Sequence, residues 1–133
     1  MAAGEHSMKL KFLAAAAFLV SAGSPALAQV APAGISDRYT ACASRAGTNT
    51  VQQGICAQSE IAAQDARLNK AYQQVMRQLA KTPDKRLALR TAQRSWLKAR
   101  DYECKIDQET INSTCLVMKT ATRANELESM VRF

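Results

Sequence analysis

Apolar side chains recur along most of the chain at alternating steps of three and four residues, the spacing that places them on one face of an α-helix. This period predicts a long helix over residues 51–80, a second over 83–106 and a third over 114–131, with a short helix over 35–45 ahead of them. Strand signals are weak. Because short connections join the long helices, we expect antiparallel neighbours. The pattern predicts an all-α fold, a small antiparallel helical bundle of three main helices plus a short N-terminal helix.

The breaks between these helices contain residues that end and start helices. Residues 46–50 contain a glycine followed by capping residues, and Thr82 is expected to cap a helix that has Pro83 in its first turn. Residues 112–114 form the last expected loop and cap. The face expected to be buried on the longest helix comprises Val51, Gly54, Gln58, Ile61, Asp65, Leu68, Tyr72, Val75 and Leu79.

Polar residues interrupt the expected buried faces, where they are costly unless they are paired. A turn near Thr82 would place Asp65 level with Arg100, and Tyr72 level with Gln93. We therefore expect an ion pair in the first case and a hydrogen bond in the second. Arg123 of the last helix would reach the same level and share Asp65. We favour a structural role over a ligand site, because every expected partner is internal. The expected polar ladder comprises Asp65, Asn69, Tyr72, Gln93, Trp96, Arg100 and Arg123.

The start of the chain has the pattern of a secretory signal peptide. Lys9 and Lys11 precede an apolar run over residues 12–20, and Ala26-Leu27-Ala28 forms a cleavage site with small residues at its first and third positions. A membrane anchor is the alternative, but the run is shorter than the roughly 20 residues that a span needs. We expect residues 1–28 to be a signal peptide, 29–36 a flexible N-terminal segment and 37–133 the helical domain.

Four cysteines follow this leader: Cys42, Cys56, Cys104 and Cys115. An even number of cysteines in a small exported domain predicts disulfides. We favour the local pairs Cys42–Cys56 and Cys104–Cys115, each of which would stabilise the fold by about 2–4 kcal/mol. A bridge between Cys56 and Cys104 stays open, because the two are nearly level across the hairpin. Zinc is disfavoured, since no Cys-x-x-Cys occurs and the only histidine, His6, lies in the leader.

The chain without its leader would be strongly basic. Removing Lys9, Lys11 and Glu5 from 18 Lys+Arg and 11 Asp+Glu leaves 16 and 10, a net charge of +6. This charge favours anionic envelope polymers or lipid headgroups as partners, and the exported compartment argues against nucleic acid. The basic residues around the expected hairpin tip are Lys70, Arg77, Lys81, Lys85, Arg86, Arg90, Arg94 and Lys98.

The exported domain has no recognisable catalytic constellation. It has no histidine, no Gly-rich phosphate loop and no serine-nucleophile motif. Paired carboxylates can cleave glycosides, but Asp65 is expected to be ion-paired and the other acids to lie on the surface. We therefore expect a binding protein rather than an enzyme, with no cofactor and no metal.

Three segments together resemble a known family. Residues 65–72 read Asp-x-x-Leu-Asn-x-x-Tyr, residues 92–101 read Ala-Gln-x-x-Trp-x-x-x-Arg-Asp, and a third segment runs from Cys115 through Arg123 to Leu127. With the four cysteines, they resemble the LprI-type domain of small exported bacterial proteins, which is named for a lysozyme inhibitor. The resemblance covers about Cys42 to Leu127. It implies a helical, disulfide-containing envelope domain, with a lysozyme or other muramidase as a protein partner.

The chain departs from the family's lipoprotein members, because no cysteine for lipidation follows its leader; we expect it to be periplasmic or secreted and not to span the membrane. Common animal-type lysozymes are strongly basic, so an inhibitor is expected to present an acidic patch. The candidate contact residues are Asp101, Glu103, Asp107 and Glu109. The alternative function is an envelope-associated module that binds anionic polymer or the membrane surface through the basic hairpin tip.

Overall fold

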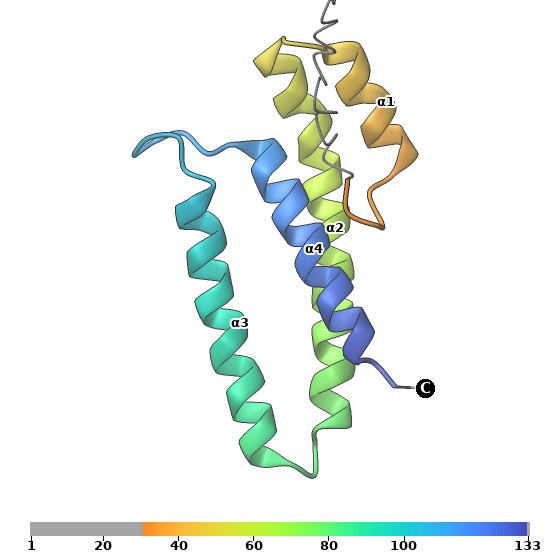
Figure 1. The fold of residues 1–133 in the computed structure, drawn as a ribbon, viewed down its shortest axis with the longest axis vertical. Coiled ribbons are helices and arrows are strands. Elements are labelled where there is room, and N and C mark those ends of the chain that lie inside the picture. The colour runs from red at the N-terminus through yellow and green to blue at the C-terminus, as the bar shows by residue number, and fades with distance from the viewer. Residues whose placement is uncertain (1–30, 133) are drawn as a thin grey trace, which may run out of the picture.

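The computed structural model describes residues 31–132, in which four helices run alternately up and down (Figure 1). They are α1 (Asp37–Ala46), α2 (Thr50–Gln78), α3 (Pro83–Glu103) and α4 (Ser113–Met130). The predicted all-α bundle is confirmed, and every helix boundary lies within three residues of its predicted position. The expected signal peptide, residues 1–28, lies outside the described residues. Among residues 31–132, no helix is long and apolar enough to cross a membrane.

Side-chain caps fix where three of the helices begin. Ser36, Asn49 and Asn112 each accept a hydrogen bond from the backbone N–H three residues ahead, at 3.0–3.1 Å. Pro83 opens α3, as predicted. Thr82 occupies the N-cap position, as predicted, but its side chain makes no capping hydrogen bond, because its hydroxyl donates instead to a carbonyl of the preceding turn at 3.2 Å.

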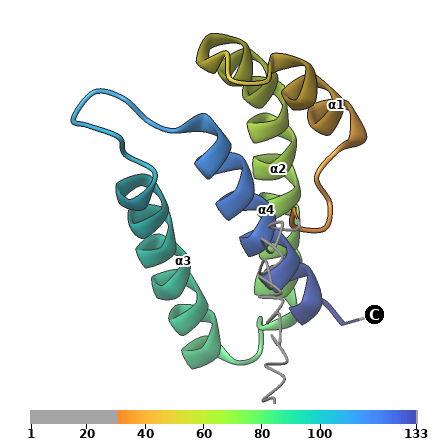
Figure 2. The same ribbon diagram turned by 45° about the horizontal axis from the view of Figure 1, so that its top comes forward.

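Helix α2 is the centre of the bundle, and α4 lies along it in the same direction (Figure 1). The turned view shows α1 against the first half of α2 and α3 on the outer side (Figure 2). Alanines at the buried positions of α2 and α4 have no side-chain bulk to hold the two backbones apart. Two apolar clusters result, and their buried members are Tyr39, Cys56, Ala57 and Val117 in one and Leu68, Ala71, Ala124 and Leu127 in the other.

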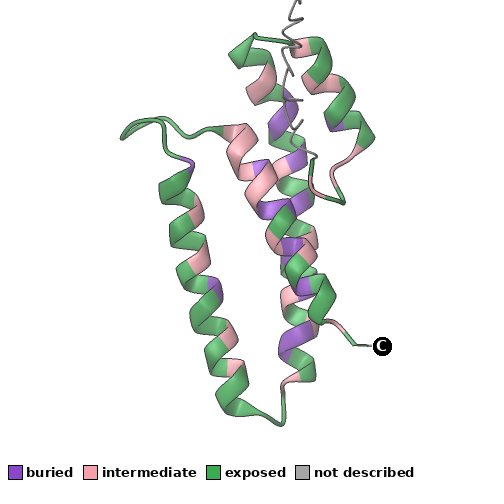
Figure 3. Ribbon diagram, in the orientation of Figure 1, coloured by how far each residue is buried: buried purple, intermediate pink, exposed green. Residues whose placement is uncertain are grey.

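Helix α3 is the least buried of the long helices (Figure 3). Gln93 is its only buried residue, while Leu89 and Trp96 are half-buried against the cluster around Leu68 and Leu127. The sequence predicts α2 and α3 to be antiparallel neighbours, which they are (Figure 1), but the most extensive helix packing is between α2 and α4. Helix α3 therefore adds to the bundle through a few long side chains rather than through a continuous apolar face.

The buried face of α2 differs from the predicted face in its first half. Val51 and Gln58, both expected to be buried, are exposed, whereas Ala57, Glu60 and Gln64 are buried. Beyond Leu68 the predicted and observed faces largely coincide. The difference arises because α1 and α4 cover the first half of α2 along a face made of small and hydrogen-bonded polar residues, which has no apolar period.

Glu60 is a buried carboxylate with three hydrogen-bond donors. Ser36 donates to it from its backbone N–H at 3.0 Å and from its hydroxyl at 2.6 Å, and Gln64 donates from its side-chain amide at 2.8 Å. Burial opposes ionisation, but these hydrogen bonds and the nearby charge of Arg38 outweigh it and lower the pKa of Glu60 below its ordinary value. The charged carboxylate is thus the form that the fold stabilises.

The same network holds the chain just ahead of α1, in a segment that we expected to be flexible. The Gly34 carbonyl accepts from Gln64 at 2.9 Å, and the Ala33 carbonyl accepts from Asn125 of α4 at 3.0 Å. Gly34 has a φ of 87°, and a β-carbon there would collide with the Arg67 guanidinium. Residues 33–36 are therefore anchored to α2 and α4.

Replacing Glu60 with Gln should lower the free energy of unfolding at pH 7 by about 1–3 kcal/mol, because the amide offers donors where Ser36 needs an acceptor. Because the pKa of Glu60 is lowered in the folded state, its contribution to stability is fully present above the ordinary glutamate pKa of about 4.3. That contribution is lost as the pH falls through the pKa that Glu60 has in the folded protein. The variant should therefore lose less stability than the parent between pH 7 and pH 3 in denaturant unfolding. Glu109→Gln, at an exposed position, is the matched control; equal stability of the two variants would contradict this prediction.

Candidate functional site

Both predicted local disulfides are present. Cys42–Cys56 joins α1 to α2 with 5.7 Å between the Cα atoms, and Cys104–Cys115 joins the end of α3 to the first turn of α4 with 5.5 Å. These pairings exclude the alternative bridge between Cys56 and Cys104. Both disulfides lie where α1 ends, α2 begins and the α3–α4 connection is located (Figure 1). We call this region, residues 42–56 and 104–115, the disulfide end.

The α3–α4 loop, residues 104–112, stands out from the helices in both ribbon views and is internally bonded (Figures 1 and 2). The Ile106 N–H donates to the Thr110 carbonyl at 2.9 Å, and the Asn112 N–H donates to the Cys104 carbonyl at 2.8 Å. Asp107 accepts two backbone N–H groups further along the loop, at 2.9 and 2.8 Å, and these hydrogen bonds lower the pKa of its carboxyl group. The loop is thus fixed at its base by a disulfide and at its tip by a side chain.

The four candidate acidic residues lie in or near this loop, but only some of their carboxylates are unpaired among the described residues. Asp101 pairs with Arg100 at 2.9 Å, and Glu103 pairs with Lys119 of α4. One carboxylate oxygen of Asp107 accepts the two hydrogen bonds inside the loop. Glu109 is exposed on the loop. The acidic surface presented by the exposed loop is therefore narrower than the sequence predicts, and consists of Asp107 and Glu109.

The polar ladder is present in part. Arg100 pairs with Asp65 at 3.4 Å, as predicted, and also donates to Thr120 of α4 at 3.3 Å. Its guanidinium carbon lies 5.3 Å from the centre of the Trp96 ring, within cation–π range. Asn69, a member of the predicted ladder, has an exposed side chain in the groove between α2 and α3.

Two of the predicted ladder contacts are wrong, and α4 is the reason. Gln93 accepts from Arg123 of α4 at 3.0 Å rather than from Tyr72, which is half-buried beside it. Arg123 pairs with Glu126 at 2.8 Å and lies 5.9 Å from the Trp96 ring centre, so it does not share Asp65. Arginines from two helices thus contact the single tryptophan and attach α3 to the bundle.

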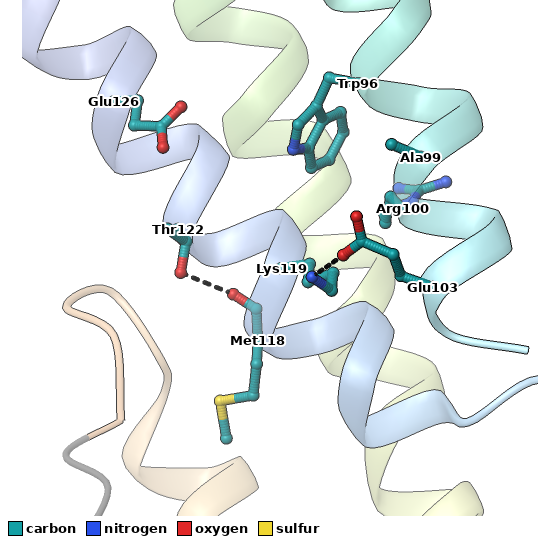
Figure 4. Close-up of a pocket in the computed structure, with 8 residues that line it drawn as sticks. All are labelled: Trp96, Ala99, Arg100, Glu103, Met118, Lys119, Thr122 and Glu126. Atoms are coloured by element: carbon teal, nitrogen blue, oxygen red, sulfur yellow. Dashed lines mark hydrogen bonds and ion pairs between the residues drawn. The ribbon is translucent and has the colours of Figure 1, made fainter.

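A groove of about 380 Å³ lies between α3 and α4, beside Trp96 (Figure 4). Its two carboxylates are both engaged, Glu103 with Lys119 and Glu126 with Arg123. Throughout residues 31–132, no three His, Cys, Asp or Glu side chains gather as a metal site requires. The polar groups of this groove satisfy one another, which favours a structural role for it.

The predicted basic hairpin tip is exposed. Seven of its eight basic side chains are exposed and Arg86 is half-buried, and none of the eight pairs with a carboxylate within the described part of the chain. The Arg86 Nε is buried with no hydrogen-bond partner. It lies in a groove of about 410 Å³ that Arg77 and Arg90 also line. This surface therefore carries positive charge that the described residues leave unpaired.

Sequence reasoning missed the network of Glu60, Gln64 and Arg67. Arg67 donates to Gln64 at 2.6 Å and forms a two-bond ion pair with Glu128 of α4, at 2.7 and 3.1 Å. A signal was present, because steps of four and three place these polar residues on one helix face. A polar face with this spacing is ordinarily solvent-exposed, so the pattern alone did not mark it as buried.

Replacing Cys104 and Cys115 together with Ser should loosen the α3–α4 loop, because the disulfide fixes the base from which it projects. We expect a loss of stability of about 3 kcal/mol for a loop of this length and faster amide exchange across residues 105–111. Hydrogen exchange followed by mass spectrometry measures this, with Cys42Ser/Cys56Ser as the comparison. Unchanged protection of the Ile106 and Asn112 amides would show that the disulfide does not hold the loop.

Comparison with known proteins gives one family match. The family model described as lysozyme inhibitor LprI matches residues 42–127, from the first cysteine to the last buried leucine of α4. No curated protein and no solved structure matches significantly. The matched region includes both disulfides, the Asp65–Arg100 pair and the arginine contacts with Trp96. The chain therefore belongs to the LprI lysozyme inhibitor family.

Proposed function

We propose that the chain is an exported binding protein that inhibits a lysozyme, in the periplasm or after secretion. The observation that carries this proposal is the family match over residues 42–127. Two disulfides fit an oxidising compartment outside the cytoplasm, and the expected signal peptide at residues 1–28 would deliver the chain there. The proposed role is binding rather than catalysis, in keeping with the family's description as an inhibitor.

Inhibition of a muramidase requires only that a rigid element occupy its cleft. Glycosidases cleave between two carboxyl groups that flank the bond, so filling the space between them excludes the polysaccharide. The α3–α4 loop suits this task, because its base is joined by Cys104–Cys115 and its tip is ordered by Asp107. A loop that is ordered before binding loses little conformational entropy on association.

The net positive charge of the chain does not prevent an encounter with a basic enzyme. The 29 residues of α2 span about 44 Å at 1.5 Å per residue, and the turn between α2 and α3 lies at the far end of α2 from the loop (Figure 1). The Debye length at physiological ionic strength is about 8 Å. Basic residues at that turn, such as Lys81 and Lys85, are therefore screened from the loop, whose own Asp107 and Glu109 face an approaching partner.

The oxidised chain, produced without residues 1–28, should slow the lysis of a peptidoglycan suspension by a basic animal-type muramidase. Glu109→Lys should weaken this inhibition severalfold, because it reverses a charge that faces the enzyme. Asp84→Lys makes the same change in the first turn of α3, at the opposite end, and should leave inhibition unchanged. Absence of inhibition of animal-type, goose-type and invertebrate-type lysozymes at large molar excess would refute the proposed function.

A second candidate function rests on the basic hairpin tip. The buried Arg86 Nε needs an acceptor, and an anionic oxygen entering the groove beside Arg77 and Arg90 would supply one. Such a surface would hold the chain on an anionic envelope polymer or on a membrane surface. This function is compatible with inhibition, because the two surfaces lie at opposite ends of the molecule.

Binding of the oxidised chain to isolated cell-wall polymer should fall steeply between 50 and 300 mM salt, because exposed charges are screened. Replacing Arg77, Arg86 and Arg90 together with Gln should reduce retention at 50 mM salt severalfold. Arg38→Gln combined with Arg45→Gln, on α1, is the control and should change retention little. Salt-independent retention, or equal retention by both variants, would count against a role for the tip.

A further inference from the structure

Large apolar side chains are exposed at the disulfide end. Val51 is 70% exposed and Ile55 is 55% exposed, one turn apart on the same face of α2. On the α3–α4 loop, Ile106 is 66% exposed and Ile111 is 45% exposed. Single exposed apolar residues are ordinary, but a group of them from two separate elements indicates an interaction surface.

These two elements form one groove. Val51 from the first turns of α2, and Ile106 and Ile111 from the loop, line a hollow of about 290 Å³. Thr50, Thr110 and Asn112 also line it, so the hollow has both apolar and polar walls. Protein-binding surfaces ordinarily combine apolar and polar groups in this way.

Both walls of the groove are held in place before any partner arrives. The α2 wall follows the Asn49 cap and is fixed to α1 by Cys42–Cys56. The loop wall is fixed by Cys104–Cys115 and by the hydrogen bonds between its two arms. The apolar groups are therefore presented in a fixed arrangement, at the place where the bundle has both of its covalent cross-links.

The charges beside the groove identify the kind of partner that fits it. The loop carries Lys105, Asp107 and Glu109, which gives it a net charge of −1. A second copy of this chain would bring the same carboxylates to a two-fold contact, whereas a basic protein brings the complementary charge. A basic protein with an apolar projection is thus the occupant that matches both features.

We infer that this groove, lined by Val51, Ile106 and Ile111, is the surface through which the chain contacts the muramidase. The inference rests on the proposed function and identifies the residues that perform it. Apolar contact supplies most of the affinity, and the loop carboxylates orient the approach. Inhibition should therefore depend weakly on salt, in contrast to retention at the basic tip.

Val51→Asp and Ile106→Asp, made separately in the full oxidised chain, should each raise the inhibition constant against the basic animal-type muramidase at least tenfold, as expected for central interface residues. Leu87→Asp is the matched control, because Leu87 is 60% exposed near the hairpin tip. It should leave the inhibition constant unchanged. Because all three positions are exposed, circular dichroism should show parental helix content and thermal midpoint.

The outcomes separate this inference from the proposed function. A parent chain that inhibits, with unchanged inhibition by Val51→Asp and Ile106→Asp, would overturn the groove and leave the proposed function in place. A parent chain that inhibits no muramidase would overturn both. Light scattering tests the remaining alternative. If the parent chain is a dimer and either groove variant is a monomer, the groove binds a second copy of the chain and the inference is overturned.

Discussion

Helices α2 and α4 approach closely because the positions between them are occupied by small side chains, with Ala71 and Ala124 beside Leu68 and Leu127. This contact is the one on which the other elements depend. Helix α1 packs on the first half of α2 and against Val117 of α4, and the network of Glu60, Gln64 and Arg67 crosses from α2 to α4. Helix α3 then attaches through Arg100, which pairs with Asp65 of α2 and donates to Thr120 of α4, and through Arg123 of α4, which contacts Trp96.

The local features of the fold could be predicted because each depends on nearby residues. The helix ends follow from caps such as Asn49 and Asn112 and from Pro83, and both disulfides close short loops. The Asp65–Arg100 pair followed from the hairpin register alone. Predictions failed where a third helix decided the outcome: Arg123 of α4 took the place expected for Tyr72 beside Gln93.

The candidate binding surface was predicted only in part, for a related reason. The loop acids could be identified from their order along the chain, but the ion pairs of Asp101 and Glu103 depend on how α3 meets α4. Periodicity marks Val51 as apolar without saying whether another helix covers it. Among residues 31–132 no helix covers it, and the residue that sequence reasoning assigned to the core lines an exposed groove instead.

Because α3 contacts the rest of the bundle through few residues, its sequence can change more freely than those of α2 and α4. Most of its surface faces solvent, and its contacts with the bundle are concentrated in a few residues around Gln93, Trp96 and Arg100. Substitutions elsewhere on α3 leave the α2–α4 core untouched, whereas a larger residue at Ala71 or Ala124 would force those helices apart. Substitutions can therefore change the charge of the outer helix at little cost in stability, whereas the central pair of helices tolerates few changes of side-chain size.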